Sequence, residues 1–173
     1  MAYYYLISSL PMLKSDGDMP LSYAEFLEMC RGVVGESKYE YFKNLSLSSN
    51  QGPLISEWAA FYTTLKEELN FQRNARLGRK QKTPTYRDEN IAKAVSQAIN
   101  HKNPLKAEEI LLSLEFKKLD EIVGIHYFDI EALVGYALKL KLLERKTSFK
   151  YNEGKAELDN IIEKLEQEIM SIE

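Results

Sequence analysis

The chain has 173 residues, of which 23 are Lys or Arg and 26 are Asp or Glu, giving a formal net charge of −3 at pH 7. Hydrophobic residues make up 45% and charged residues 28%, a composition that excludes disordered, collagen-like and disulfide-rich chains. A chain of this length buries a sizeable core without disulfides. Its single cysteine, Cys30, is therefore expected to be a small reduced core residue, as in a cytoplasmic protein.

The sequence contains neither a membrane span nor a secretion signal. A spanning helix needs about 20 mostly apolar residues, and even Leu133–Leu143 is interrupted by Lys139 and Lys141. Residues 1–11 lack the basic region and the long apolar stretch of a secretory signal. We expect a cytoplasmic protein, and its mild acidity disfavours a dedicated nucleic-acid-binding protein.

The first elements of the chain are short. Tyr3–Leu10 is aromatic and apolar, so its pattern leaves a strand and a buried helical turn both open. Ser22, followed by Glu25 three residues later, has the pattern of a capping box and predicts a helix start. A second, shorter helix is expected over residues 39–45, and the polar residues 46–52 predict a loop.

A long helix is predicted to begin at Pro53, because proline is tolerated in the first turn of a helix. Its apolar stripe, at three- and four-residue spacing, consists of Leu54, Trp58, Phe61, Tyr62, Leu65 and Leu69. The aromatic members of this stripe are interpreted as core residues rather than as a base-stacking platform. The helix is expected to end near Leu77, where Gly78 can take a left-handed conformation.

Three further helix starts are predicted in the second half by polar residues that precede apolar stripes. These residues are Asp88, Asn103 followed by Pro104, and Asp129. The stripe of the middle helix slips around residues 115–118, which predicts a kink or a break there.

A final helix is expected within residues 153–172. Its apolar stripe consists of Leu158, Ile161, Ile162, Leu165, Ile169 and Ile172, and its outer face is highly charged. The connection from the preceding helix is short, so we predict that Leu133, Ala137 and Leu138 pack against this stripe as an antiparallel pair.

Helical stripes cover most of the chain, and no two-residue alternation extends beyond a few positions, so the predicted fold class is all-α. We expect a compact multi-helix bundle that forms one domain over residues 1–173. Residues 79–87 are a candidate boundary, so one bundle and two packed helical lobes both remain open.

The sequence lacks the usual signatures of catalysis, so we expect a protein that is not an enzyme and holds no cofactor. No Walker A sequence or dinucleotide fingerprint occurs. Cys30, His101 and His126 are too few, and too irregularly spaced, for a zinc site, so no metal site is predicted. His126 is interpreted as a histidine of a helix end or of the core.

Two pairs of adjacent carboxylates, Glu67–Glu68 and Glu108–Glu109, stand out as candidate acid–base groups. Neighbours on a helix point about 100° apart, so they cannot share one proton as a catalytic dyad does. We interpret both pairs as parts of solvated helix faces.

The clearest local departure from an ordinary surface is a stretch without acidic residues between positions 73 and 87. Its basic residues, the candidate partner-binding residues, are Arg73, Arg76, Arg79, Lys80, Lys82 and Arg87. Such a stretch binds anionic partners or is simply a solvated linker, and both interpretations stay open. Among partners, an acidic protein is favoured over nucleic acid, because Tyr86 is the only aromatic residue that accompanies the cations after residue 72.

Two parts of the sequence resemble known families. Residues 128–145, followed by Asn152-Glu153-Gly154-Lys155, are similar to the closing helical pair of the funnel-shaped subunit of archaeal and vacuolar-type rotary ATPases, which is C-type in archaea and d-type in eukaryotes. Residues 3–11, the Trp58 helix and residues 74–78 resemble a small bacterial family that accompanies V-type ATPase genes.

These resemblances imply an all-helical, non-catalytic subunit with a structural, coupling or assembly role. Its partners would be the central stalk or the membrane rotor ring, and no nucleotide binding is implied. The protein would be cytoplasmic, or peripheral at the inner membrane through its partners. Because the chain is much shorter than the three-lobed funnel of those ATPases, whether it replaces or supplements the funnel stays open.

Two alternatives from other classes are kept. The first is a helical adaptor that uses residues 73–87 to bind anionic ligands, with nucleic acid as one case. The second is an enzyme with a carboxylate site between helices, which would require a polar pocket where the sequence shows apolar seams.

Overall fold

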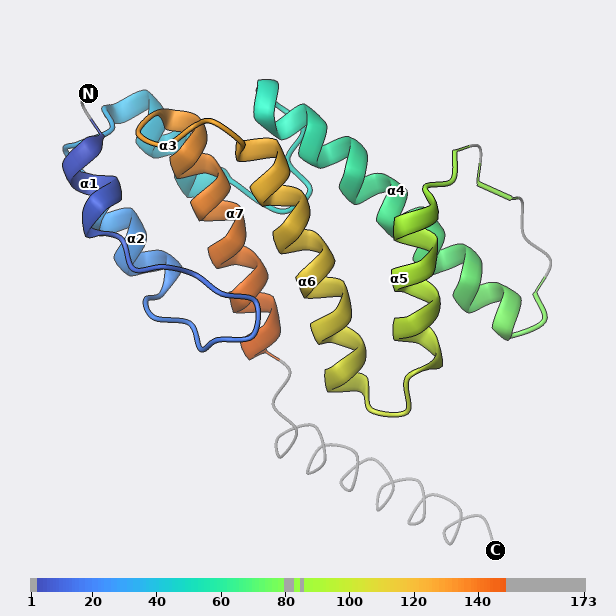
Figure 1. The fold of residues 1–173 in the computed structure, drawn as a ribbon. Coiled ribbons are helices and arrows are strands. Elements are labelled where there is room, and N and C mark those ends of the chain that lie inside the picture. Colours follow the sequence, from blue (N-terminus) through green and yellow to red (C-terminus); the bar gives the residue numbers. More distant parts are fainter. Residues whose placement is uncertain (1–2, 80–82, 85, 149–173) are drawn as a thin grey trace, which may run out of the picture.

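The computed structural model describes residues 3–79, 83–84 and 86–148, and within these ranges it contains α-helices and no β-strand (Figure 1). In chain order the helices are α1 (Tyr4–Ser9), α2 (Tyr23–Cys30), α3 (Glu36–Asn44), α4 (Pro53–Arg76), α5 (Glu89–Asn100), α6 (Pro104–Val123) and α7 (Ile130–Thr147). The predicted all-α fold class is confirmed. Within the described ranges, no helix combines the length and apolarity that crossing a membrane requires.

The aromatic segment near the start of the chain is helical. Helix α1 is only six residues long, and the residue that it buries is Leu6. Tyr4 and Tyr5 remain exposed on its first turn. The sequence pattern left this segment open because a single buried residue in so short a helix produces no periodicity.

Polar caps start the helices where the sequence predicted them. The Ser22 hydroxyl accepts the Glu25 N–H, and the Glu25 carboxylate accepts the Ser22 N–H, so the capping box is complete. The side chains of three further residues accept backbone N–H groups at the starts of α5, α6 and α7: Asp88, Asn103 and Asp129. Helix α3 begins at Glu36, earlier than predicted, because Gly35 ends the preceding turn with a φ of 74°.

The end of α4 also follows the sequence. Gly78 has a φ of 67°, its N–H donates to the Ala75 carbonyl, and the Arg79 N–H donates to the Asn74 carbonyl. This pair of bonds is a Schellman motif, which satisfies carbonyls that would otherwise lack a partner at the helix end.

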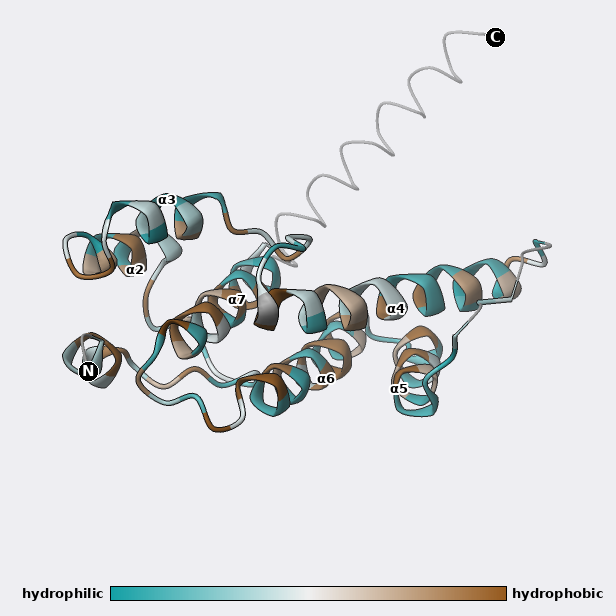
Figure 2. Ribbon diagram, turned by 90° about the horizontal axis from the view of Figure 1, so that it is seen from above, coloured by the Kyte–Doolittle hydropathy of each residue, from teal (hydrophilic) through white to brown (hydrophobic). Residues whose placement is uncertain are grey.

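Helix α6 packs against α4, α5 and α7, and α2 packs against another side of α7 (Figure 1). Seen from above, α5 turns its apolar residues toward α4 and its polar residues outward (Figure 2). Its buried residues, Ile91, Val95 and Ala98, follow the helical spacing read from the sequence. Helices on both sides of residues 79–87 contribute to one hydrophobic cluster.

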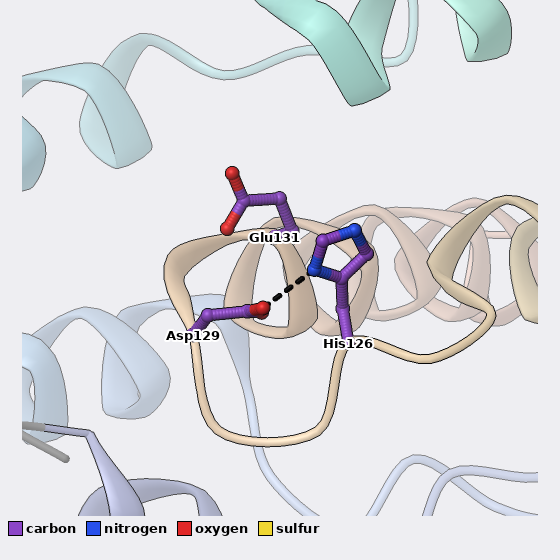
Figure 3. Close-up of side chains that lie close together, drawn as sticks. All are labelled: His126, Asp129 and Glu131. Atoms are coloured by element: carbon purple, nitrogen blue, oxygen red, sulfur yellow. Dashed lines mark hydrogen bonds and ion pairs between the residues drawn. The ribbon is translucent and has the colours of Figure 1, made fainter.

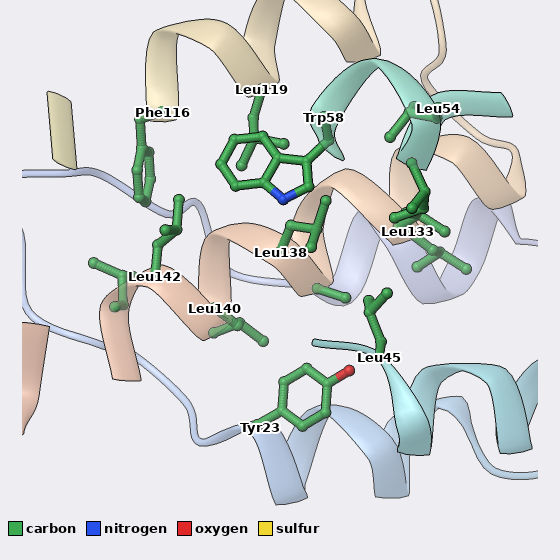
Figure 4. Packing of buried hydrophobic residues seen from close by; sticks show 14 of the residues in the cluster. Tyr23, Leu45, Leu54, Trp58, Phe116, Leu119, Leu133, Leu138, Leu140 and Leu142 are labelled. Carbon is green, nitrogen blue, oxygen red and sulfur yellow. The ribbon is translucent and has the colours of Figure 1, made fainter. Parts of the chain in front are cut away.

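Trp58 lies at the centre of this cluster. Figure 4 shows it between Leu119 of α6 and Leu138 of α7, and all three side chains are fully buried. The Trp58 indole N–H donates to the Leu47 carbonyl at 3.0 Å, so the buried ring leaves no polar atom without a partner. Cys30 is buried in the same cluster as predicted, and burial raises the pKa of its thiol to about 12.

Helix α7 is buried along most of its length. Leu133, Ala137 and Leu138 are fully buried, as predicted. The partners predicted for them, in residues 153–172, lie outside the described residues. Within the described ranges, these three side chains belong to the cluster formed with α2, α4 and α6.

Helix α6 does not break where its apolar stripe slips. It is continuous from Pro104 to Val123. The stripe is interrupted because Glu115, a charged residue, occupies a core position with only 1% of its surface exposed. The prediction of a break at residues 115–118 was therefore wrong, and the apparent irregularity marks a buried ion pair.

Candidate interaction surface

Exposed apolar side chains gather at one end of the molecule, where α1 meets the connection between α6 and α7. We call this surface the aromatic end, and define it as Tyr4, Tyr5, Ile125, Tyr127 and Phe128. Tyr5 is 85% exposed, Ile125 86% and Tyr127 69%. The rings of Tyr4 and Phe128 lie 4.8 Å apart, so segments more than a hundred residues apart in sequence form one surface.

Local chain geometry keeps these side chains outside the core. Gly124 ends α6 with a φ of 50°, and the His126 N–H donates to the Val123 carbonyl. Asp129 caps α7 by accepting the Ala132 N–H at 3.0 Å. The connection is pinned at both ends, so its apolar residues cannot join either helical stripe.

A close approach of the two helices fixes the connection further. Gly135 of α7 is buried, and a Cβ atom at this position would collide with the side chain of Val123 on the last turn of α6. A β-branched side chain cannot rotate away easily. The absence of a side chain at Gly135 therefore sets the spacing of α6 and α7 just below the aromatic end.

A polar cluster stands beside the aromatic end. His126 Nδ1 lies 2.5 Å from Asp129 Oδ2, and Glu131 completes a group whose candidate ligand atoms all lie within 4.8 Å of one another (Figure 3). The hydrogen bond from Asp129 raises the pKa of His126 above its usual range. Partial burial opposes ionisation of Asp129, but the bonds from His126 and the Ala132 N–H lower its pKa.

Histidine and carboxylate side chains at such distances have the chemistry of divalent-metal ligands. In this cluster, however, both oxygens of Asp129 already have partners, one on the histidine and one at the start of α7. The arrangement is explained by capping and by the charge preference of a helix N-terminus. We assign no metal to it.

The predicted partner-binding residues fall into separate environments. Arg73, Arg76 and Arg79 are exposed around the end of α4. Arg76 is not wholly solvated, because its Nη1 donates to the Ile99 carbonyl at 2.5 Å. Lys80 and Lys82 lie outside the described residues.

Arg87 corrects the picture of a stretch without acids. Its Nε and Nη2 donate to Glu68 Oε1 at 3.2 and 2.9 Å, so a carboxylate from α4 meets this cation in space. The Gln72 amide donates to the same oxygen at 2.6 Å and to the Ala92 carbonyl at 3.0 Å. This cluster ties the connection after α4 to α4 itself and to α5.

The interpretation of the adjacent carboxylates as solvated faces was wrong for Glu68 and for Glu108. Glu68 is 2% exposed, and the Glu108 side chain is mostly covered because it receives Arg145 Nε at 2.8 Å. The one-dimensional pattern missed both because their arginine partners lie far away in the sequence.

The same arginine neutralises Glu115. Arg145 Nη1 and Nη2 donate to the two oxygens of Glu115 at 3.0 and 2.5 Å, a bidentate pair between α6 and α7. Burial opposes the charge of Arg145, but the hydrogen bonds and charge of Glu115, together with Glu108, raise its pKa. The arginine therefore remains charged, and the group joins helices rather than offering a reactive carboxylate.

Taken together, the fold is a helical bundle with internally paired charges and an exposed aromatic end. Residues 89–169 match the model of a family described as a protein of unknown function, DUF2764. The match includes α5, α6, α7 and the connection that carries Ile125, Tyr127 and Phe128. No curated protein and no solved structure matches the chain.

The aromatic end was not recognised in the sequence. The signal that was available is the apolar run between the helix-ending Gly124 and the capping Asp129, since a connection between helices is usually polar. Its contact with Tyr4 had no signal, because it depends on how α1 docks beside α7.

Proposed function

We propose that the chain is a non-catalytic structural or assembly subunit of a V/A-type rotary ATPase, in contact with its central stalk or membrane rotor ring. The rotary ATPase comes from the sequence resemblance. The observation that carries the rest is the aromatic end, a rigidly held group of apolar side chains turned toward solvent. The protein would act in the cytoplasm, or at the inner membrane through its partners.

Aromatic side chains support a protein contact for a physical reason. Each buries a large apolar area when a partner covers it, at about 25 cal/mol per Å², and Tyr and Phe are enriched in the cores of interfaces. Tyrosine loses little conformational freedom on binding. The pinned connection and the Gly135 approach reduce the ordering cost further, because the surface is already in place.

The polar clusters fit a structural role. Glu68, Glu108 and Glu115 each receive an arginine from another part of the chain, so their charges are used to join helices. In this proposal the chain transmits force or guides assembly through packed helices and carries out no bond chemistry.

Copurification tests the proposal. Tagged protein expressed from its native locus and isolated in mild detergent should bring down stalk or rotor-ring subunits. A Tyr5→Ser/Tyr127→Ser variant should lose them, whereas Tyr86→Ser should keep them. Tyr86 is a matched control because it is 67% exposed but lies outside the aromatic end. Absence of ATPase subunits from the wild-type preparation would overturn the proposal.

A second candidate function is a helical adaptor that binds anionic ligands at the end of α4. The observation that favours it is the exposure of Arg73, Arg76 and Arg79 around a single helix end. Arg73→Glu with Arg79→Glu should abolish binding to a polyanion without lowering the melting temperature. Arg76 is left unchanged in this variant because it holds Ile99.

Ionic strength provides the second measurement for this alternative. Affinity for nucleic acid should fall steeply as salt is raised. Lack of binding to nucleic acid and to acidic protein at low salt would remove the adaptor function and return these arginines to a solvated surface.

A further inference from the structure

We propose that the aromatic end binds a basic amphipathic helix of a partner protein. The inference deepens the proposed function, since it names the chemistry of the partner at the same surface. It does not depend on which protein supplies the helix.

The apolar half of the argument is the concentration of exposed side chains. Among the described residues, the large hydrophobic side chains that are exposed number ten, and five of them belong to the aromatic end. Tyr4 and Tyr5 come from the first turn of α1, and Phe128 meets Tyr4 from the other segment. A surface built from two segments in this way offers contact over more than one turn of an approaching helix.

The charged half is an excess of carboxylates around this surface. Residues 119–138 contain four acids and no lysine or arginine. Asp120 and Glu121, two of these acids, pair with Lys139 and Lys118. The remaining two acids are Asp129, which shares its charge with His126, and Glu131.

Within the described residues, no cation lies within ion-pair distance of Glu131 other than the neighbouring histidine of its cluster. Helix α1 carries no charged residue. The nearest cation from the α1 side is Lys38 of α3, whose Nζ bonds the Tyr3 hydroxyl at 2.6 Å. Lysine or arginine flanking an apolar stripe would therefore meet uncompensated carboxylates beside aromatic rings.

The same charges disfavour the other occupants. An anionic membrane would repel the carboxylates, and a second copy would place them against each other. The chain's own residues 153–173 carry seven acids against two lysines, so they have the wrong sign for this surface. A basic helix is the occupant whose apolar and charged parts both match.

The test is a titration of the full chain with two synthetic helical peptides that share one leucine stripe. One peptide carries lysine on its polar face and the other carries glutamate. We expect the lysine peptide to bind at least about tenfold more tightly. Tyr5→Ser/Tyr127→Ser should reduce its affinity by about tenfold or more, and Glu131→Gln should reduce both the affinity and its dependence on salt.

Matched controls separate this surface from general stickiness. Tyr86→Ser removes an aromatic side chain of similar exposure, and Glu57→Gln removes an exposed carboxylate of α4. Neither should change binding, and circular dichroism melts should show that every variant is folded. Equal binding of the two peptides, or equal losses in the control variants, would overturn the inference.

Two other outcomes would also overturn it. Self-association that depends on Tyr5 and Tyr127, without peptide binding, would assign the surface to a second copy. Preferential binding to vesicles of anionic or neutral phospholipid would assign it to a membrane. Peptide selectivity without copurified ATPase subunits would contradict only the proposed function, and copurification without peptide selectivity would contradict only this inference.

Discussion

Glu115 and Glu68 are both buried glutamates with an arginine partner, but the two partners reach them differently. Arg145 comes from within α7 and bonds both oxygens of Glu115. Arg87 comes from the connection between α4 and α5, has 51% of its side chain exposed, and bonds one oxygen of Glu68. The other oxygen, Oε2, is buried without a hydrogen-bond partner among the described residues.

This difference shows how the position of a donor in the fold determines the strength of a buried ion pair. A donor on a packed helix has its backbone fixed by the core, so all of its hydrogen bonds can be aligned at once. A donor on a connection is partly hydrated and fixed by fewer contacts. We therefore expect the α6–α7 pair to support stability more than the α4 pair.

The largest effect is expected from Arg145→Met, which keeps the aliphatic stem and removes the charge. Glu115 would be left buried and uncompensated, so the free energy of unfolding should fall by about 3 to 5 kcal/mol. Urea denaturation followed by circular dichroism measures this loss. Arg145→Met combined with Glu115→Leu should recover most of it, and a single-variant loss below about 1 kcal/mol would contradict the comparison.

An apolar reference is provided by Leu138→Ala. Leu138 is fully buried beside Trp58, so the cavity and the lost transfer energy should cost about 2 to 5 kcal/mol. The same urea titration gives the value. A cost smaller than about 1 kcal/mol would mean that α7 is packed more loosely than its burial indicates.

Arg87→Met is expected to cost less, about 1 to 2 kcal/mol, because Gln72 still donates to Glu68 and the arginine is half-exposed. Arg73→Met, an exposed arginine nearby, serves as its control and should stay within about 0.5 kcal/mol of wild type. Thermal and urea unfolding should agree on this order. An Arg87 loss equal to that of Arg145 would remove the distinction between the two pairs.

The smallest effect is expected from the exposed pair of His126 and Asp129. The hydrogen bond raises the pKa of His126 in the folded protein, so its stabilisation is complete below the unfolded value of about 6.5 and is lost as pH rises through the folded value. Melting temperatures of wild type and His126→Gln should converge between pH 6 and pH 8. A gap that widens with rising pH would reverse the assigned sign.

Local sequence signals predicted the helix boundaries well because capping depends on a few neighbouring residues. Ser22 with Glu25 and Asn103 with Pro104 needed nothing from the rest of the chain. Gly78 likewise ended α4 through bonds to the preceding turn. These features carry their structural cause within a window of five or six residues.

The candidate site could not be predicted in the same way. Glu115 looks like an interruption of a stripe until Arg145, 30 residues later, is placed opposite it. The contact of Tyr4 with Phe128 depends on tertiary docking of a helix too short to show a period. Pairings between distant residues need the fold before they can be read, and both the ion pairs and the aromatic end are of this kind.

The hydrogen bonds that α7 makes to the start of the chain have a consequence for synthesis. The Tyr136 hydroxyl donates to the Pro11 carbonyl 125 residues earlier, and Lys146 reaches the carbonyls of Ser15 and Gly17. Phe26 of α2 packs against Tyr136. On the ribosome, the first segments must therefore wait, with apolar side chains uncovered, until the seventh helix emerges. Folding of this chain should depend on late closure over distant contacts, and ribosome-bound fragments that stop before α7 should bind chaperones or aggregate.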